Sequence, residues 1–127
     1  MPDRRNIPSG AAIEDRIGYC RAVVAGGHVF VSGTAPIMPD DADPPADAYG
    51  QAQRCLEIVE SSLREAGCSL ADVVRTRIYV TRRELIDEVG RAHAEAFADV
   101  GPACTGVVVQ LLDPRWLVEL EVDALLP

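Results

Sequence analysis

Lysine is absent from this 127-residue chain, so all 12 of its basic residues are arginines. The chain therefore has no side-chain amine for Schiff-base catalysis and no P-loop lysine for a nucleotide phosphate. Its net charge is -8, because 20 acidic residues face those 12 arginines. Nucleic-acid binding is typical of basic patches, and the only short basic clusters here are Arg4-Arg5 and Arg82-Arg83. We expect no nucleic-acid partner.

Metal and disulfide patterns are also lacking. The four cysteines are far apart with no Cys-x-x-Cys pair, and only two histidines accompany them. Neither a zinc site nor a disulfide framework is indicated, so we expect reduced thiols and no metal. No apolar run approaches the roughly 20 residues of a membrane helix, and no secretory signal is visible. These absences predict a soluble, cytoplasmic protein without a membrane partner.

The length fits one domain with one core, spanning residues 1–127. Two short apolar runs, residues 19–24 and 29–32, flank Gly26-Gly27 and predict a β-hairpin. Residues 34–46 hold four prolines and three aspartates, a composition that favours a surface loop over a helix or strand.

Helical and strand periodicities follow that loop. Apolar residues at steps of three and four predict a helix from about Asp47 to Ala66, ended by Gly67. Alternation predicts a strand over residues 73–80, and a second helix is expected over residues 85–99. The predicted apolar stripe of this second helix consists of Ile86, Val89, His93, Ala96 and Phe97.

The predicted order β-β-α-β-α-β-β describes a two-layer α+β domain. In such a domain two helices pack on one face of a mixed β-sheet, and this small chain has nothing left to cover the other face. Self-association is the simplest way to cover it.

The last predicted strand places Glu119, Glu121 and Asp123 on one face and three apolar residues on the other. Three carboxylates in a row repel one another and usually need a cation, a water network or a ligand nearby. We predict that Glu119 is functional, with the alternative of a solvated or Arg-paired carboxylate, and that Glu121 is structural.

Several short motifs occur in a characteristic order. They are Ser32-Gly33-Thr34 after the second strand, Gly67 after the first helix, Pro102-Ala103 before the fourth strand and the closing Val118-Glu119-Leu120-Glu121. Together with the element order, they resemble the RidA family, also called YjgF or L-PSP endoribonuclease, over about residues 17–125. The resemblance implies a chorismate-mutase-like fold and a homotrimer with a central β-barrel. It also implies a small-molecule cleft between neighbouring subunits.

The resemblance further implies that the cleft hydrolyses reactive enamines and imines, releasing ammonia without metal or cofactor. Tyr19 matches a tyrosine that lines the pocket, and Glu119 matches a glutamate that positions the attacking water. Cys104 stands where the family has an arginine that binds the substrate carboxylate, and a neutral thiol cannot form that bidentate contact. Gly90 and His93 replace a common asparagine and tyrosine. The chain thus resembles divergent branches that lack the arginine.

Each candidate residue also has a structural alternative. Cys104 is either a nucleophile or a small apolar filler, and Tyr19 either orients a substrate or packs in the half-buried strand. Arg21, two residues along the predicted strand from Tyr19, either replaces the missing guanidinium or pairs with the acid row. His93 is either an acid–base group or a hydrogen-bonded core residue. Arg115 either reaches a neighbouring subunit's cleft or is solvated. The candidate substrate-binding set is Arg21, Ser32, Gly33, Thr34, His93 and Arg115.

Three functions follow from this reading. The first is an imine or enamine hydrolase with altered substrate choice, in which Glu119 directs water and Tyr19 orients the substrate. The second is a non-catalytic or regulatory ligand-binding trimer. The third, an endoribonuclease, is the least favoured, because the acidic charge and the lack of lysine oppose RNA binding.

Overall fold

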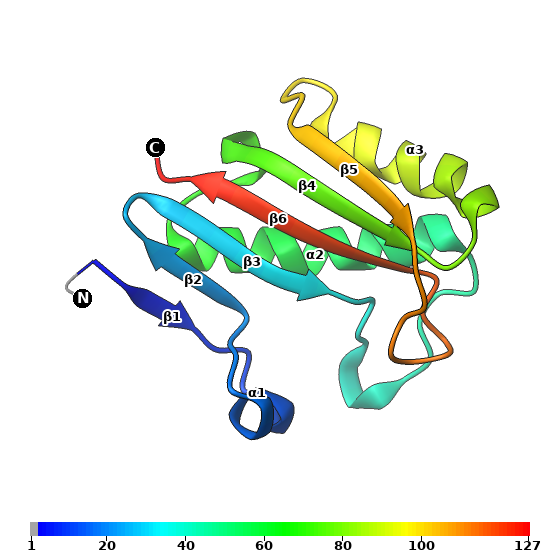
Figure 1. Cartoon of the computed structure of the whole chain (residues 1–127), viewed down its shortest axis with the longest axis horizontal. Helices are drawn as coiled ribbons and strands as arrows, with labels where there is room; N and C mark the ends of the chain where they lie inside the picture. Colours follow the sequence, from blue (N-terminus) through cyan, green and yellow to red (C-terminus); the bar gives the residue numbers. More distant parts are fainter. Residues whose placement is uncertain (1–2) are drawn as a thin grey trace.

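Six strands form one sheet in the computed structural model of the chain, which describes residues 3–127 (Figure 1). The strands are β1 (Arg5–Ile7), β2 (Ala22–Ala25), β3 (His28–Thr34), β4 (Val73–Val80), β5 (Ala103–Val108) and β6 (Val118–Leu125). Their order across the sheet is β1-β2-β3-β6-β4-β5. Only the β4–β5 pair is parallel, so the sheet is mixed.

Two long helices lie behind this sheet in Figure 1. They are α2 (Ala48–Ala66) and α3 (Ile86–Phe97), and a short helix α1 (Ala12–Ile17) precedes β2. Three 3₁₀ turns complete the fold: η1 (Pro39–Asp41), η2 (Leu70–Asp72) and η3 (Arg83–Leu85). The carboxylate of Asp47 accepts a hydrogen bond from Gly50 N at 2.9 Å and caps α2.

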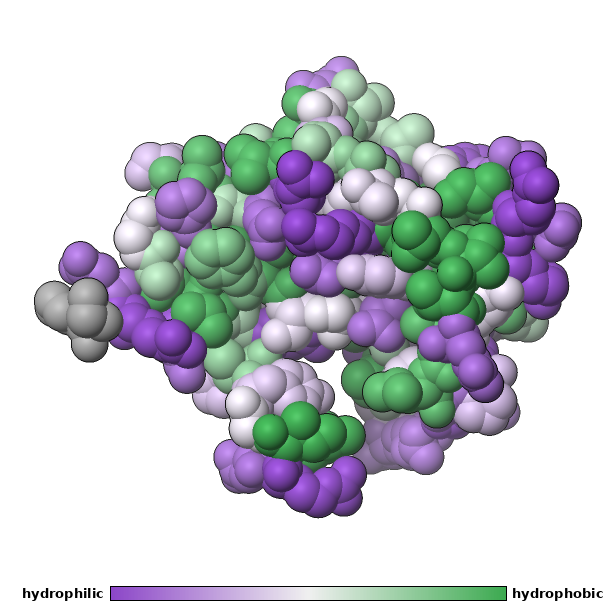
Figure 2. All heavy atoms as spheres, viewed as in Figure 1, coloured by the Kyte–Doolittle hydropathy of each residue, from purple (hydrophilic) through white to green (hydrophobic). Residues whose placement is uncertain are grey.

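The core lies between the helices and the facing side of the sheet. Val118, Leu120 and Val122 of β6 are at most 1% exposed, and Val59 and Leu63 of α2 pack in the same cluster. The acidic residues of β6 therefore point to the open face, as the alternation predicted. Figure 2 shows hydrophilic side chains near the centre of that face with hydrophobic side chains to either side.

The two-layer α+β architecture, the hairpin, α2 and β4 are confirmed. Gly26 and Gly27 form the two-residue hairpin turn with φ of 57° and 78°. Residues 34–46 form a connection as expected, although Thr34 still belongs to β3 and η1 supplies one 3₁₀ turn. No helix among residues 3–127 is long and apolar enough to cross a bilayer.

Strand β1 and helix α1 were not predicted, and two expectations were wrong. Tyr19 and Arg21 were expected on a strand, but β2 begins only at Ala22, because the chain is still leaving α1 through Gly18 at φ 92°. Ile86 was expected on the apolar stripe of α3, whose other members pack inward, yet it is 41% exposed, because it starts the helix and extends toward Gly106 of the uncovered strand β5.

Candidate functional site

A β-bulge in β3 creates the local geometry of the site. Val31 pairs with Val122 but Thr34 pairs with Leu120, so three steps along β3 match two along β6. The extra residue falls at Ser32-Gly33 and brings this backbone beside Glu119. A Cβ atom on Gly33 would overlap Oε1 of Glu119. Glycine is therefore what lets the carboxylate lie directly against the bulge.

Arg21 fixes the bulge from the other side. Its Nη2 donates hydrogen bonds to Ser32 O at 2.7 Å, Gly33 O at 2.9 Å and Thr34 Oγ1 at 2.8 Å. The Ser32 hydroxyl donates to Cys20 O at 2.7 Å, and the fully buried Thr34 hydroxyl donates to Ser32 O at 2.8 Å. The structure thus brings together Arg21, Ser32, Gly33, Thr34 and Glu119, which we call the bulge cluster.

The bulge cluster combines a carboxylate with a cation in partial burial. Burial raises the pKa of Glu119, Glu121 adds to the rise, and the nearby Arg21 opposes it. Burial lowers the pKa of Arg21, while attraction to Tyr19, Glu14 and Glu119 opposes that effect. The Nε atom of Arg21 is buried and has no hydrogen-bond partner among residues 3–127. A carboxyl with a raised pKa is better suited than an ordinary glutamate to accepting and returning a proton.

Tyr19 lies beside the bulge cluster. It follows α1, is 43% exposed and lines a pocket of about 430 Å³ together with Glu14, Cys20 and Ser32. Glu14 is itself buried and accepts hydrogen bonds from the backbone and hydroxyl of Ser9. Figure 2 shows a notch between the lobe containing α1 and the loop containing η1, and β3 ends at the head of this notch (Figures 1 and 2).

Cys104 and His93 lie elsewhere in the fold. Cys104 is exposed on the edge strand β5, in register with Thr76, which pairs in turn with Val122. Paired residues point to the same side of a sheet, so Cys104 is on the helix side and Glu119 is on the open side. The Nε2 atom of His93 is 2.8 Å from Thr76 Oγ1, and burial lowers the pKa of this histidine. Within one chain, Cys104 and His93 are separated from the bulge cluster by the sheet.

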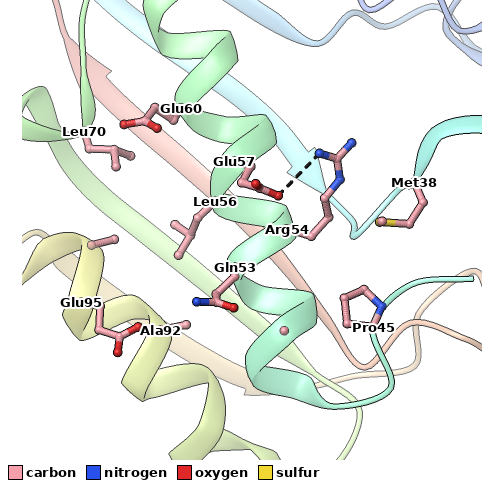
Figure 3. A pocket seen from close by; sticks show the side chains of 12 residues that line it. Met38, Pro45, Gln53, Arg54, Leu56, Glu57, Glu60, Leu70, Ala92 and Glu95 are labelled. Atoms are coloured by element: carbon pink, nitrogen blue, oxygen red, sulfur yellow. Dashed lines mark ion pairs between the residues drawn. The ribbon is translucent and has the colours of Figure 1, made fainter.

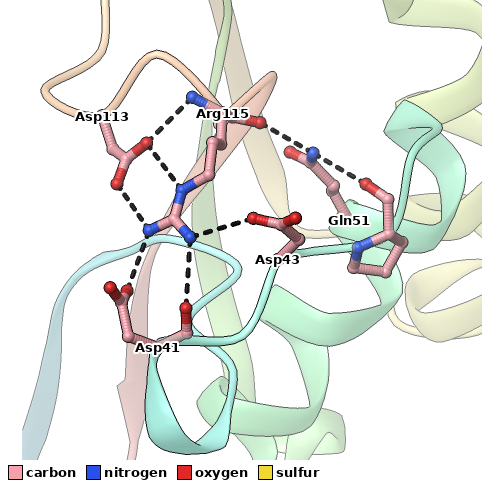
Figure 4. Close-up of polar contacts among 6 residues, drawn as sticks. Asp41, Asp43, Gln51, Asp113 and Arg115 are labelled. Carbon is pink, nitrogen blue, oxygen red and sulfur yellow. Dashed lines mark hydrogen bonds and ion pairs between the residues drawn. The ribbon is translucent and has the colours of Figure 1, made fainter.

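Arg115 is directed at aspartates of its own chain (Figure 4). Its Nη2 lies 2.9 Å from Oδ1 of Asp41 and 2.9 Å from Oδ2 of Asp113, and its Nη1 lies 3.2 Å from Oδ1 of Asp43. The guanidinium therefore does not contact the bulge cluster.

Two polar features were not identified from the sequence, namely a hydrogen-bonded network on the open face and a buried glutamine. On the open face, Arg77 Nη1 binds Glu121 at 3.0 Å and Asp123 at 3.4 Å, and the Tyr79 hydroxyl donates to Glu121 at 2.8 Å. The alternation of Arg77 and Tyr79 with apolar residues in β4 was the available signal. The second is Gln51, which is 2% exposed on the inner side of α2. A polar residue among the apolar helical positions was its signal.

Figure 3 shows a second hollow, a groove of about 550 Å³ between α2 and α3. Leu56 and Ala92 lie in it with Glu57, Glu60 and Glu95, and none of the predicted site residues lines it. Among residues 3–127, no three His, Cys, Asp or Glu side chains are arranged so that they could hold a metal ion. The bulge cluster, not this groove, combines a carboxylate of raised pKa with a cation.

Comparisons with known proteins agree on one family. The family model described as endoribonuclease L-PSP matches residues 9–126. An uncharacterized protein of Streptomyces coelicolor, SCO2049, is 37% identical over 94% of this chain and 90% of its own length. TdcF of Escherichia coli, whose name assigns it provisionally to the reactive intermediate deaminases, is 30% identical over 84% of each chain. The crystal structure of Rv2704 from Mycobacterium tuberculosis, described as a YjgF/YER057c/UK114 family member, matches with a TM-score of 0.88 and 41% identity, over 97% of this chain and 99% of that one.

Proposed function

The chain belongs to the endoribonuclease L-PSP family, also called the YjgF or RidA family, and from this premise we propose that it hydrolyses small reactive imines or enamines. The observation that carries the proposal is the Glu119 carboxylate, held against the Gly33 backbone beside the Arg21 guanidinium, with its pKa raised by burial. The deaminase name of TdcF, a relative covered over most of its length, supports the reaction class.

In the proposed reaction, water adds to the carbon of the C=N bond. Glu119 accepts a proton from the water as it adds to the protonated imine, which gives a carbinolamine, and then donates this proton to the nitrogen. As the C–N bond breaks, the carbinolamine hydroxyl becomes the carbonyl and gives its proton to Glu119, which passes it to the departing ammonia. Tyr19, at the pocket beside Ser32, orients the substrate with its phenol. Because the Arg21 hydrogen bonds to the bulge come from Nη2, Nη1 is left to attract a negatively charged substrate group.

We further propose that the working form is a homotrimer with the site between subunits. Strand β5 is exposed along its whole length, and its Val107 and Val108 are 42% and 56% exposed. Burying these apolar side chains against a second copy would remove them from water. Cys104 and His93, which lie across the sheet from Glu119, would then belong to the cleft formed with a neighbouring chain's bulge cluster.

The proposed substrate follows from Cys104. If this residue occupies the position of the family's carboxylate-binding arginine, a substrate carboxylate has no bidentate partner there. The substrate then either lacks that carboxylate or is held through Arg21.

The test is ammonia release from a freshly generated 2-imino acid, measured above the spontaneous rate. We expect turnover by the wild type, its loss in Glu119→Gln, and wild-type turnover in Glu57→Gln, whose glutamate is exposed on α2. Cys104→Arg distinguishes the two substrate options. Activity gained only in that variant would mean that the natural substrate lacks the carboxylate. Full turnover in Glu119→Gln would refute the mechanism.

A non-catalytic ligand-binding trimer is the second candidate. It is favoured by one observation, namely that the cation of the bulge cluster is already engaged with the backbone of Ser32 and Gly33. No turnover by wild type or Cys104→Arg, together with saturable binding of a small keto acid or amino acid, would support it. RNA cleavage is the least favoured, because a net charge of -8 repels a phosphate backbone.

A further inference from the structure

We infer that Arg115 is a positioning residue that clamps the loop after Thr34 to the segment before Glu119, and so fixes the bulge cluster from outside. The inference rests on the proposed function for what the bulge cluster does. The contacts that suggest it belong to the fold and do not depend on the reaction.

The guanidinium of Arg115 is fully engaged (Figure 4). Its Nε and Nη2 donate to the two carboxylate oxygens of Asp113 at 3.1 and 2.9 Å. Its Nη2 also reaches Asp41 Oδ1 at 2.9 Å, and its Nη1 donates to Asp41 O and Asp43 Oδ1, both at 3.2 Å. All three guanidinium nitrogens donate hydrogen bonds within the chain, mostly to aspartates, so Arg115 has no free pair of N–H groups with which to bind a substrate.

The loop between Thr34 and α2 depends on these contacts. Asp40 and Asp41 both adopt left-handed backbone conformations, with φ of 56° and 54°. Two consecutive non-glycine residues in that region are unfavourable and persist only when surrounding contacts hold them. Arg115 supplies such contacts, because it binds both the backbone and the side chain of Asp41. The same loop starts directly after Thr34, whose hydroxyl accepts a hydrogen bond from Arg21.

The other side of the clamp leads to Glu119. The buried Gln51 donates through Nε2 to Arg115 O at 3.0 Å and to Pro45 O at 2.9 Å. Its Oε1 accepts from Leu117 N at 2.8 Å. Residues 115 and 117 are thus fixed just before β6 begins, and Glu119 is the second residue of that strand. A displacement of Arg115 would be transmitted to both ends of the bulge cluster.

The clamp is electrostatic and partly solvated. The side chains of Asp41 and Asp43 are 89% and 87% exposed, whereas those of Arg115 and Asp113 are 34% and 25% exposed. Single exposed ion pairs contribute little to stability, but one guanidinium shared by three carboxylates has a defined geometry. The loss of Arg115 should therefore loosen the loop more than it lowers the stability of the whole domain.

The experiment compares the wild-type chain with Arg115→Gln, Arg115→Lys and Asp43→Asn. The matched control is Arg64→Gln, which removes an exposed arginine that pairs with Glu60 on α2. Amide hydrogen exchange reports on residues 35–47 and 110–118. A ¹³C NMR titration of the Glu119 carboxyl, assigned with Glu119→Gln, reports on the bulge cluster without requiring turnover. Imine hydrolysis provides kcat and KM.

In Arg115→Gln we expect faster amide hydrogen exchange in residues 35–47 and 110–118. We also expect the pKa of Glu119 to fall toward the ordinary glutamate value, because water enters the bulge cluster. We also expect kcat to fall by up to about 100-fold with a smaller change in KM, because misplacement acts on the transition state. Arg115→Lys should recover part of each effect, Asp43→Asn should show a milder form, and Arg64→Gln should match the wild type.

Unchanged exchange and an unchanged Glu119 titration in Arg115→Gln would overturn the inference. So would a loosened loop with a wild-type Glu119 titration, because Arg115 would then be merely structural. Should Arg115→Gln not fold, Arg115→Lys and Asp43→Asn decide by the same two readouts. Absence of turnover in every protein would refute the proposed function alone, since exchange and titration still test the clamp.

Discussion

Replacing Gly33 with alanine should separate function from stability. The new methyl group would occupy the space of Glu119 Oε1. The obstructing atom is the end of a flexible side chain, so Glu119 can rotate away while β3 and β6 remain paired. The backbone of Gly33 does not require a positive φ, so alanine is compatible with the conformation itself.

The expected effects of Gly33→Ala on the free energy of unfolding and on the rate of imine hydrolysis differ in size. Moving Glu119 into a less favourable rotamer costs about 0.5–1.5 kcal/mol. Alanine in place of glycine recovers about 0.5–1 kcal/mol, because the unfolded chain loses conformational freedom. The net change in the free energy of unfolding should therefore be within about 1 kcal/mol. Misplacing the carboxylate by the width of a methyl group should slow imine hydrolysis by about 100-fold, equivalent to about 2.7 kcal/mol of transition-state stabilisation.

The assay pairs urea unfolding with ammonia release from a 2-imino acid. Gly106→Ala is the control for stability, because its added methyl group would lie 3.8 Å from Ile86 Cδ1, an ordinary contact, in another strand. Wild-type turnover in Gly33→Ala would refute the reasoning that the carboxylate must lie against the bulge. A loss of several kcal/mol of stability would refute it too, because the clash would then have moved the backbone.

Three further results are expected. Because burial raises the pKa of Glu119, the native state holds this proton more tightly than the unfolded chain, and its ionisation destabilises the fold as pH rises through the raised pKa. Glu119→Gln should therefore have a larger free energy of unfolding than wild type at pH values above the raised pKa. This difference should vanish at pH values below the pKa that Glu119 has in the unfolded chain. Urea unfolding curves at a series of pH values test this, and a difference that persists at acidic pH would contradict it. Cys55 is fully buried and burial raises its pKa far above the ordinary thiol value, so a thiol reagent at pH 8 should label it only on unfolding, and rapid labelling in the native protein would contradict the packing. Leu120→Ala should cost about 2–5 kcal/mol in urea unfolding, since Leu120 is 1% exposed at the centre of the sheet, and a cost below 1 kcal/mol would mean that the core collapses around the cavity.

The periodic part of the fold was predictable from the sequence. The burial of alternate residues in β6 and of every third or fourth residue in α2 is a repeated signal, and the observed bounds agree with it to within a residue at Val73–Val80 and Ala48–Ala66. Strand β1 could not be predicted, because Arg5–Ile7 has only three residues and is held by pairing with β2, which is a tertiary effect. Helix α1 is similarly short and has no side-chain cap.

Most residues of the candidate site could be identified from the sequence, but their positions and contacts in the fold could not. The sequence identified Arg21, Gly33 and Glu119, which the fold brings together. It misplaced Arg21 on a strand, since nothing in the local pattern shows that its side chain reaches across to the β3 bulge. The contacts of Arg115 with Asp41 and Asp43 join residues more than 70 positions apart, and only the tertiary structure brings them together.

The position of Cys104 is an argument that one chain does not contain the complete proposed site. Cys104 points to the helix side of the sheet and Glu119 to the open side, with strand β4 between their strands. No side-chain rotation brings two groups across a packed β-sheet, because the core residues of β4 and β6 lie between them. If both residues act on one substrate, they must come from different chains, and hydrolysis per chain should fall on dilution below the dissociation constant of the assembly. If dilution to monomers leaves the rate per chain unchanged, Cys104 has no part in the reaction and the bulge cluster works alone.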